Sequence, residues 1–145
     1  MRLVIQRVTD AEVKVGSDLV GKIDKGMFVL VGVCEGDNEK DAIFLAEKLV
    51  KLRVMADVEG KMNLNLIDAG GSALIISQFT LYADTSGGNR PSFIKAGDPK
   101  NAERLYKLFI NKVRESGVPV ETGKFGSYMT IETELDGPVT ILIES

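Results

Sequence analysis

Histidine and tryptophan are absent from this sequence of 145 residues, and cysteine occurs once. Without histidine, the protein lacks the commonest general base at neutral pH, any serine or cysteine nucleophile activated by imidazole, and any zinc site with an imidazole ligand. Any catalysis must therefore come from carboxylates, lysine, hydroxyls, backbone dipoles or the substrate itself.

Disulfides and long apolar runs are lacking as well. Cys34 has no second cysteine to pair with, and a chain of this length folds without a disulfide, so we expect a protein of the reducing cytoplasm. Arg2 and Arg7 interrupt the first apolar run, which is unlike a signal peptide or a spanning helix. No membrane partner is expected, and the length predicts one domain over residues 1–145.

Positive charge is not in excess, because 18 basic residues stand against 21 acidic ones, for a formal net charge of −3. A protein with a broad surface for nucleic acid is normally basic, so the charge argues against extensive binding of a duplex. It does not argue against a local contact with one end of a nucleic acid. One predicted helix carries basic residues that would suit phosphates, but interspersed glutamates favour an ordinary solvated face. These basic residues are Lys100, Arg104, Lys107 and Arg114.

Two segments show the spacing of apolar side chains that is typical of a helix on a protein surface. The first covers residues 42–50 and follows the cap candidates Asp37 and Asn38. The second begins at Asp98-Pro99, with proline at the first helical position, and ends at Gly117.

Alternating or continuous apolar residues predict strands in most of the remaining chain. Residues 57–71 are expected to be irregular, and Asp136-Gly137-Pro138 is most simply a hairpin turn between the last two strands. The pattern indicates an α+β fold of mixed β-sheets covered by two helices, and it lacks the glycine motifs of nucleotide folds. The expected strands are 3–8, 11–15, 19–23, 27–33, 53–55, 72–82, 118–122, 127–135 and 139–143.

Polar side chains at the end of the apolar run 72–76 are the first candidates for chemistry. Alternation along a strand would place Ser77 and Phe79 on one face and Gln78 and Thr80 on the other. No base lies nearby in sequence to activate either hydroxyl. A strand end whose polar groups bond to the backbone is an equal alternative.

Two further segments are weaker candidates. The segment 125–129 combines Phe125 and Met129 with Gly126, where a backbone would approach a flat ligand closely, although such residues more often pack in a core. Gly137-Pro138 would present carbonyls without a side chain. The carboxylates have no spacing that specifies a metal, so we expect neither a metal nor another cofactor.

Five blocks of the sequence, in order and over essentially the full chain, resemble the D-aminoacyl-tRNA deacylase family. The resemblance implies a layered β/β/α fold and a homodimeric cytoplasmic enzyme with its active sites at the subunit interface. Such an enzyme hydrolyses the ester between a D-amino acid and the 3′-terminal adenosine of tRNA, and it also acts on glycine mischarged on tRNA-Ala. The blocks are MRLVIQRV, SQFTLYAD, GGNRPSF, FGSYM and DGPVT.

The resemblance also implies roles for individual residues. Gly137 and Pro138 would enter the partner's active site with a cis bond, which overturns the hairpin interpretation, and their carbonyls would crowd an L side chain. Arg7 would hold this element in place. The residues 77–80 would line the aminoacyl pocket, with backbone N–H groups that stabilise an oxyanion.

The adenosine pocket would be formed by Phe125, Gly126 and Met129, through stacking and close backbone contact. Thr80 is a candidate nucleophile in the family, but no residue here is available to take its proton. Attack by water with help from the 2′-hydroxyl of the terminal adenosine is therefore the more consistent mechanism, with the protein supplying positioning and charge stabilisation.

This chain departs from the family pattern at two positions. Leu135 precedes Asp136 where asparagine is frequent, which would change how the Gly-Pro element is braced, and Ser127 replaces a usual alanine, which would tighten the adenosine pocket. On the residues alone, a non-catalytic dimeric module that binds an RNA end or a nucleotide is a second hypothesis. A carboxylate metal hydrolase is a third, which would need activity abolished by a chelator and which no ligand spacing supports.

Overall fold

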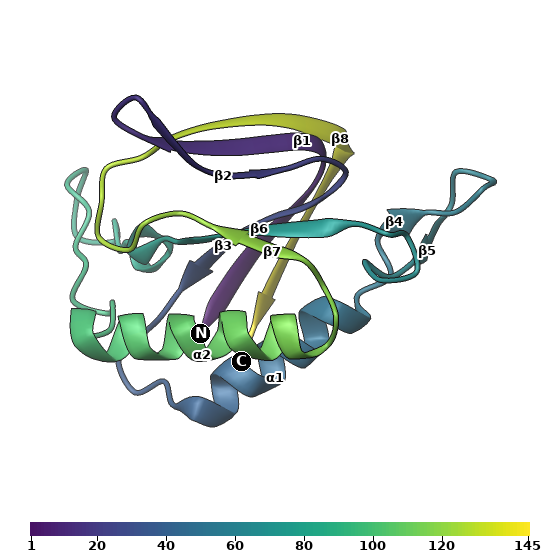
Figure 1. The fold of residues 1–145 in the computed structure, drawn as a ribbon. Coiled ribbons are helices and arrows are strands. Elements are labelled where there is room, and N and C mark those ends of the chain that lie inside the picture. Colours follow the sequence, from purple (N-terminus) through teal and green to yellow (C-terminus); the bar gives the residue numbers. More distant parts are fainter.

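The computed structural model describes residues 1–145, and its sheet is organised around the long strand β1 (Arg2–Val15) (Figure 1). Along one edge, the first half of β1 pairs with β3 (Gly26–Gly32) and the second half with β2 (Asp18–Ile23). The other edge pairs with β8 (Thr130–Glu144). All three pairings are antiparallel, so β1 is enclosed on both sides along most of its length.

Parallel strands extend the sheet beyond β3. The strand β6 (Ser72–Ser77) pairs with β3, and β7 (Val120–Thr122) pairs with β6. Because all three strands run in the same direction, their carboxyl ends lie along one edge of the sheet. The polar residues that follow β6 and the aromatic segment that follows β7 therefore leave the sheet side by side.

Both predicted helices are present with their predicted caps. In α1 (Glu39–Lys51), the side chain of Asn38 accepts from Lys40 N at 3.0 Å, and Asp41 accepts from Asn38 N at 2.8 Å. In α2 (Pro99–Glu115), Asp98 accepts from Asn101 N at 3.1 Å. The two helices pack side by side on one face of the sheet (Figure 1). Neither α1 nor α2 has the length and apolar composition of a membrane-spanning helix.

Two apolar cores separate three layers. The larger core lies between the helices and the sheet, and Leu45, Leu105 and Phe109 are fully buried in it. In the smaller core, Ile23 of β2 packs with Leu74 of β6, where β2 and the second half of β1 lie over the sheet (Figure 1). The arrangement is a mixed sheet with two helices, which confirms the expected α+β class.

Several details differ from the sequence predictions. The strands expected over 3–8 and 11–15 form one continuous strand, β1, while the strands expected over 53–55 and 127–135 begin only at Met55 and Thr130. The strand expected over 72–82 ends at Ser77, because its neighbour β3 ends at Gly32 and offers no further ladder; the chain turns instead into the 3₁₀ helix η1 (Phe79–Tyr82). The region 57–71 is not wholly irregular, since β4 (Met55–Ala56) pairs with β5 (Met62–Leu64).

The hairpin expected at residues 136–138 is absent. Residues on both sides of it pair with β1 rather than with each other, and β8 is one continuous strand. The physical reason is the length of β1, whose 14 residues offer a partner to both halves of β8. Gly137 and Pro138 therefore lie inside a strand, and their peptide bond is cis.

Candidate active site

The turn that follows β6 carries the first group of candidate residues. Gln78 N donates to Val31 O at 2.8 Å, and Leu81 N donates to Gln78 O at 3.3 Å, which begins η1. Leu81 is therefore the first residue whose N–H donates a hydrogen bond within this 3₁₀ turn. The N–H groups of Phe79 and Thr80, which come before it, have no hydrogen-bond partner inside the turn. Two adjacent N–H donors at a strand end are suited to hold a developing oxyanion.

The side chains of this turn contain no base. The amide Nε2 of Gln78 donates to Oγ1 of Thr80, and both residues lie on η1 or at its cap, so strand alternation does not describe them. Phe79 is 57% exposed, and its ring meets the Phe93 ring edge to face at 5.0 Å. The Thr80 hydroxyl thus has an amide neighbour that donates to it and no group placed to remove its proton.

Cys34 lies near the carboxyl end of β3, at the same sheet edge as this turn. Burial, followed by the nearby Asp37 carboxylate, raises the pKa of the Cys34 thiol above its ordinary value. A reactive cysteine needs a lowered pKa, so Cys34 is unsuited to act as the nucleophile.

Arg2 is a residue of this site that the sequence analysis missed. Its Nη1 donates to Leu81 O at 2.5 Å, and its guanidinium carbon lies 4.9 Å from the centroid of the Tyr82 ring. Its Nε pairs with Glu144 of β8. Arg2 thereby ties the end of η1 to the two strands β1 and β8. Only the three-dimensional structure shows this contact, because 79 residues separate Arg2 from Leu81.

A bulge in β8 carries the Gly-Pro pair. Gln6 pairs with Thr140 and Val8 with Leu135, so Arg7 is the only residue of β1 opposite residues 136–139. Such a bulge pushes the extra residues out of the ladder. Gly137 and Pro138 are both exposed, and Gly137 has a φ of +134°, which only glycine adopts readily.

Arg7 braces the base of this bulge. Its Nε lies 2.9 Å from Oδ2 of Asp136 and donates to the carbonyl oxygen of the same residue at 3.2 Å, while Nη1 donates to Val54 O at 2.9 Å. The Arg7 side chain is only 10% exposed. Asp136 thus begins the bulge, and Arg7 holds the backbone there. Leu135, which stands where asparagine is frequent, is the last residue of β8 paired with β1 before the bulge.

Within one chain, the bulge and the η1 turn lie apart. Arg7 pairs with Met27, whereas Leu3 pairs with Val31, which in turn pairs with Ser77. The bulge is therefore offset from Ser77 by four residues along the strands, about 13 Å, and β1 and β3 stand between β8 and β6. The structure does not bring Gly137 and Pro138 to the turn in the same chain.

The segment after β7 lies beside the turn. Thr122 pairs with Ile75, so the chain leaves β7 next to the end of β6. Phe125 and Met129 are half-buried, with Phe125 packed on the larger core and Met129 on the smaller one. The structure thus brings Phe125, Gly126 and Met129 to the same sheet edge as Ser77 and η1, with Gly126 exposed.

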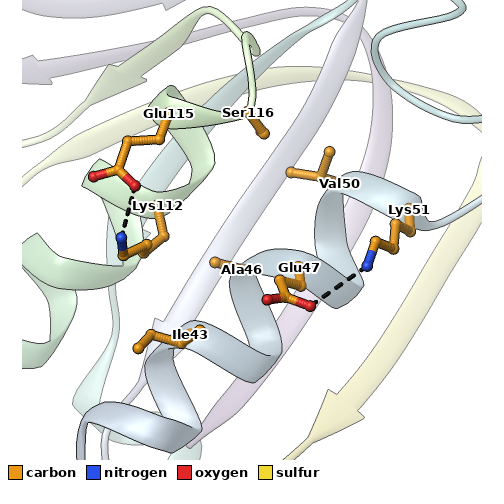
Figure 2. A pocket seen from close by; sticks show the side chains of 8 residues that line it. All are labelled: Ile43, Ala46, Glu47, Val50, Lys51, Lys112, Glu115 and Ser116. Carbon is orange, nitrogen blue, oxygen red and sulfur yellow. Dashed lines mark hydrogen bonds and ion pairs between the residues drawn. The ribbon is translucent and has the colours of Figure 1, made fainter.

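One hollow of the molecule lies away from these residues. It has a volume of about 400 Å³, lies between α1 and α2, and is flanked by the ion pairs Glu47–Lys51 and Lys112–Glu115 (Figure 2). Its lining includes none of the candidate residues. No group of three or more histidine, cysteine, aspartate or glutamate residues is arranged to hold a metal ion.

Comparison with known proteins shows similarity along the whole chain. A family model described as D-Tyr-tRNA(Tyr) deacylase matches residues 4–144. The chain is 54% identical over 145 residues to a D-aminoacyl-tRNA deacylase of Fervidobacterium nodosum, covering 100% of this chain and 97% of the relative. It is 49% identical over 145 residues to a D-aminoacyl-tRNA deacylase of Brevibacillus brevis, covering 100% of both.

Solved structures show the same fold. A structure named c-Myc DNA Unwinding Element Binding Protein has a TM-score of 0.94 and 38% identity, covering 100% of this chain and 99% of that one. A structure described as a probable eukaryotic D-amino acid tRNA deacylase has a TM-score of 0.85 and 15% identity, covering 99% and 98%. At that identity, the second likeness concerns the fold alone.

Proposed function

This chain belongs to the D-Tyr-tRNA(Tyr) deacylase family of hydrolases, and we propose on that premise that it hydrolyses the ester bond of D-aminoacyl-tRNA and releases free amino acid and tRNA. The observation that carries the proposal is the extent of the match, which covers the chain from residue 4 to residue 144. The chain is proposed to act as one domain in the cytoplasm, where it would remove D-amino acids from tRNA before translation.

The proposed reaction uses water rather than Thr80 as the nucleophile. Water adds to the ester carbonyl carbon, the N–H groups of Phe79 and Thr80 stabilise the oxyanion, and the bond to the 3′ oxygen then breaks. The 2′-hydroxyl of the terminal adenosine relays the proton from water to the leaving 3′ oxygen. The absence of a proton acceptor beside Thr80 supports this route, and the protein contributes positioning and charge stabilisation.

Selection of the D isomer is proposed to come from the Gly137-Pro138 bulge of a partner subunit. The bulge is exposed and lies away from the η1 turn of its own chain, so a second copy would have to supply it. In a homodimer with its sites at the interface, the backbone carbonyls of the bulge would crowd an L side chain. Glycine has no side chain to crowd, so glycine mischarged on tRNA-Ala would also be a substrate.

The terminal adenosine is proposed to bind at Phe125, Gly126 and Met129. A half-buried phenylalanine and methionine offer a flat apolar surface on which a base stacks. Their position beside the end of β6 supports this assignment, because the 3′ oxygen must lie near the oxyanion donors of the turn. Ser127, next to Gly126, would narrow this pocket.

An ester assay tests the proposal. Purified protein is incubated with D-tyrosyl-tRNA and L-tyrosyl-tRNA, and the loss of each ester is compared with the rate without protein. We expect fast loss of the D ester and spontaneous loss of the L ester. If both decay at the uncatalysed rate while tRNA or adenosine still binds, the protein is the non-catalytic module instead. Loss of activity with a chelator would favour the metal hydrolase.

A further inference from the structure

A second hollow, of about 330 Å³, lies between α2 and the segment that follows β7. Lys107, Asn111 and Arg114 line it from α2, and Gly123 and Phe125 line it from that segment, which passes over the helix (Figure 1). The volume is in the range of sites for small ligands. The hollow shares Phe125 with the proposed adenosine pocket and shares no residue with the η1 turn.

Phe125, which lines this hollow and belongs to the proposed adenosine pocket, is held in place by its neighbours. The ring of Phe125 packs on the ring of Tyr106 with 5.9 Å between centroids, and Tyr106 Oη donates to Ile75 O at 2.7 Å. A Cβ atom at Gly123 would lie 2.5 Å from Sδ of Met129, so the backbone there approaches Met129 as closely as a glycine allows. The hollow is therefore formed before any ligand arrives.

The charge of the hollow is positive, although the chain as a whole is acidic. Its charged lining consists of Lys107, Arg114 and Glu103. Lys107 Nζ lies 2.7 Å from Glu103, which neutralises that carboxylate. Arg114 makes no ion pair; its Nη2 donates to Val120 O at 3.1 Å, which orients the guanidinium and leaves its other N–H groups for a ligand.

We propose that this hollow binds the phosphate and ribose of the nucleotide that precedes the terminal adenosine of the tRNA substrate. Arg114 and Lys107 contact the phosphate, for which the planar guanidinium of arginine is well suited. Asn111 provides an amide for a ribose hydroxyl. The inference rests on the proposed function, because an adenosine stacked at Phe125 must continue into its 5′ neighbour, and Phe125 also lines this hollow.

The decisive experiment compares two substrates that differ only beyond the terminal adenosine. They are D-tyrosyl-tRNA and 3′-O-(D-tyrosyl)adenosine, which has no phosphate. The quantity measured is the ratio of kcat/KM for the tRNA to kcat/KM for the short ester. For Arg114→Ala and for Lys107→Ala, we expect this ratio to fall about ten-fold, since a hydrogen bond to a charged group is lost. Arg114→Lys should retain part of the ratio.

Lys112→Ala is the matched control. It removes one positive charge from the same helix, but Lys112 lines the other hollow and pairs with Glu115 (Figure 2). The wild-type ratio is expected for this variant. Salt provides a second readout, because each lost phosphate contact should lower the slope of log KM against log salt by about 0.7. Lys107 is 66% exposed, so its replacement leaves a folded protein even if Arg114→Ala does not fold.

A binding measurement separates the failure of this inference from the failure of the proposed function. Calorimetry is carried out with adenosine and with the dinucleotide CpA. We expect CpA to bind about 100-fold tighter than adenosine, because Arg114 and Lys107 each contribute about ten-fold, and we expect Lys107→Ala to reduce this difference to about ten-fold. If CpA shows this preference while neither ester is hydrolysed, the deacylase proposal fails and the nucleotide site stands. If CpA binds no tighter than adenosine and the kinetic ratio stays at the wild-type value, the nucleotide site is wrong whatever the activity.

Discussion

Arg7 of β1 and Asp136 of β8 form the ion pair at the base of the Gly-Pro bulge, with Nε and Oδ2 2.9 Å apart. Arg7 is also the only residue of β1 opposite residues 136–139, which form no ladder pairs with β1. The contacts of the Arg7 side chain therefore replace the missing backbone hydrogen bonds between the two strands. Its third contact, with Val54 O, joins the bulge to the chain segment after α1. The direction in which Gly137 and Pro138 project thus depends on one guanidinium group.

Replacing Arg7 by alanine is expected to lower both stability and activity. The variant leaves the half-buried Asp136 carboxylate and the Val54 carbonyl without their donor, at a cost of about 2–3 kcal/mol. We expect kcat/KM for D-tyrosyl-tRNA to fall more than about ten-fold, because a displaced bulge misplaces the substrate. Urea unfolding and the ester assay measure the two effects.

Lys14→Ala is the control for that experiment. Lys14 also lies on β1 and pairs with Glu132 of β8 at 3.1 Å, at a place where the ladder between β1 and β8 is regular. Its removal should change stability by less than about 1 kcal/mol, as for other surface ion pairs. Equal loss of activity in both variants would show that Arg7 acts only as a general link between the strands.

Thr80→Ala is expected to retain substantial activity, within about ten-fold of the wild-type kcat, because Thr80 has no neighbouring base and is not the nucleophile. A tRNA whose terminal adenosine lacks the 2′-hydroxyl should not be hydrolysed by either protein. Single-turnover rates with the two tRNAs measure both effects. The opposite pattern, an inactive Thr80→Ala and normal turnover of the 2′-deoxy substrate, would identify Thr80 as the nucleophile.

The elements that the sequence predicts well are those determined by local interactions. Residues 42–50 show helical spacing, and Asn38 and Asp98 cap the two helices as expected, because capping is a contact over two or three residues. The continuous apolar run 27–33 became β3 for a related reason, since it needs burial on both faces rather than one particular partner.

The features that sequence reasoning missed depend on distant partners. The residues 136–138 favour a hairpin turn locally, and only the length of β1, far away in sequence, makes them a bulge. Likewise, η1 forms where β3 ends, and the apolar residues of 79–82 carry no signal of that end. In the sequence, Arg2 is only a single charge within an apolar run. In the structure, its guanidinium contacts the carbonyl oxygen of Leu81 and the ring of Tyr82.

Arg2→Ala is expected to reduce kcat more than it raises KM. Without the guanidinium, the carbonyl of Leu81 and the ring of Tyr82 lose their contact with β1, and η1 no longer holds its N–H donors in place. We expect a loss of about ten-fold in kcat. Glu144→Gln removes the outer ion pair and leaves Arg2 on Leu81, so it should stay near the wild-type kcat. A change confined to thermal stability in Arg2→Ala would contradict a positioning role.

The start of α1 should contribute to stability in a pH-dependent way. The backbone N–H of Asn38 donates to Asp41 and lowers the pKa of that carboxyl below its usual value. A lowered native pKa means that the stabilisation is complete above the unfolded pKa of about 3.9 and is lost as the pH falls through the native value. Asp41→Asn should therefore cost about 1 kcal/mol at pH 7, and the cost should shrink as the pH falls below the unfolded pKa of the carboxyl.

Urea unfolding of wild type and Asp41→Asn from pH 7 to pH 2 measures this contribution. Asp24→Asn is the control, since Asp24 is exposed and its side chain makes no hydrogen bond or ion pair in the structure. A constant difference between wild type and Asp41→Asn across the whole range would mean that the carboxylate does not contribute through its charge.

Gly137→Ala tests whether the bulge needs glycine. Glycine could be needed for its positive φ or for the close contact with Val139, and Gly16→Ala separates these two causes because only the first applies there. At Gly137, the φ of +134° strains any L residue, and an added Cβ would also lie 2.7 Å from Val139 N. At Gly16, the φ is +61° and nothing lies within 4 Å, so only the backbone strain applies. We expect Gly16→Ala to cost about 1 kcal/mol and to leave activity intact, and Gly137→Ala to cost more and to lower kcat/KM for D-tyrosyl-tRNA about 100-fold.

The loss of activity in Gly137→Ala is expected because the bulge must shift to relieve the contact with Val139. A shift of this size moves the carbonyls that are proposed to discriminate between D and L esters. Hydrolysis of D-tyrosyl-tRNA at the wild-type rate by a folded Gly137→Ala protein would rule out that role for the bulge.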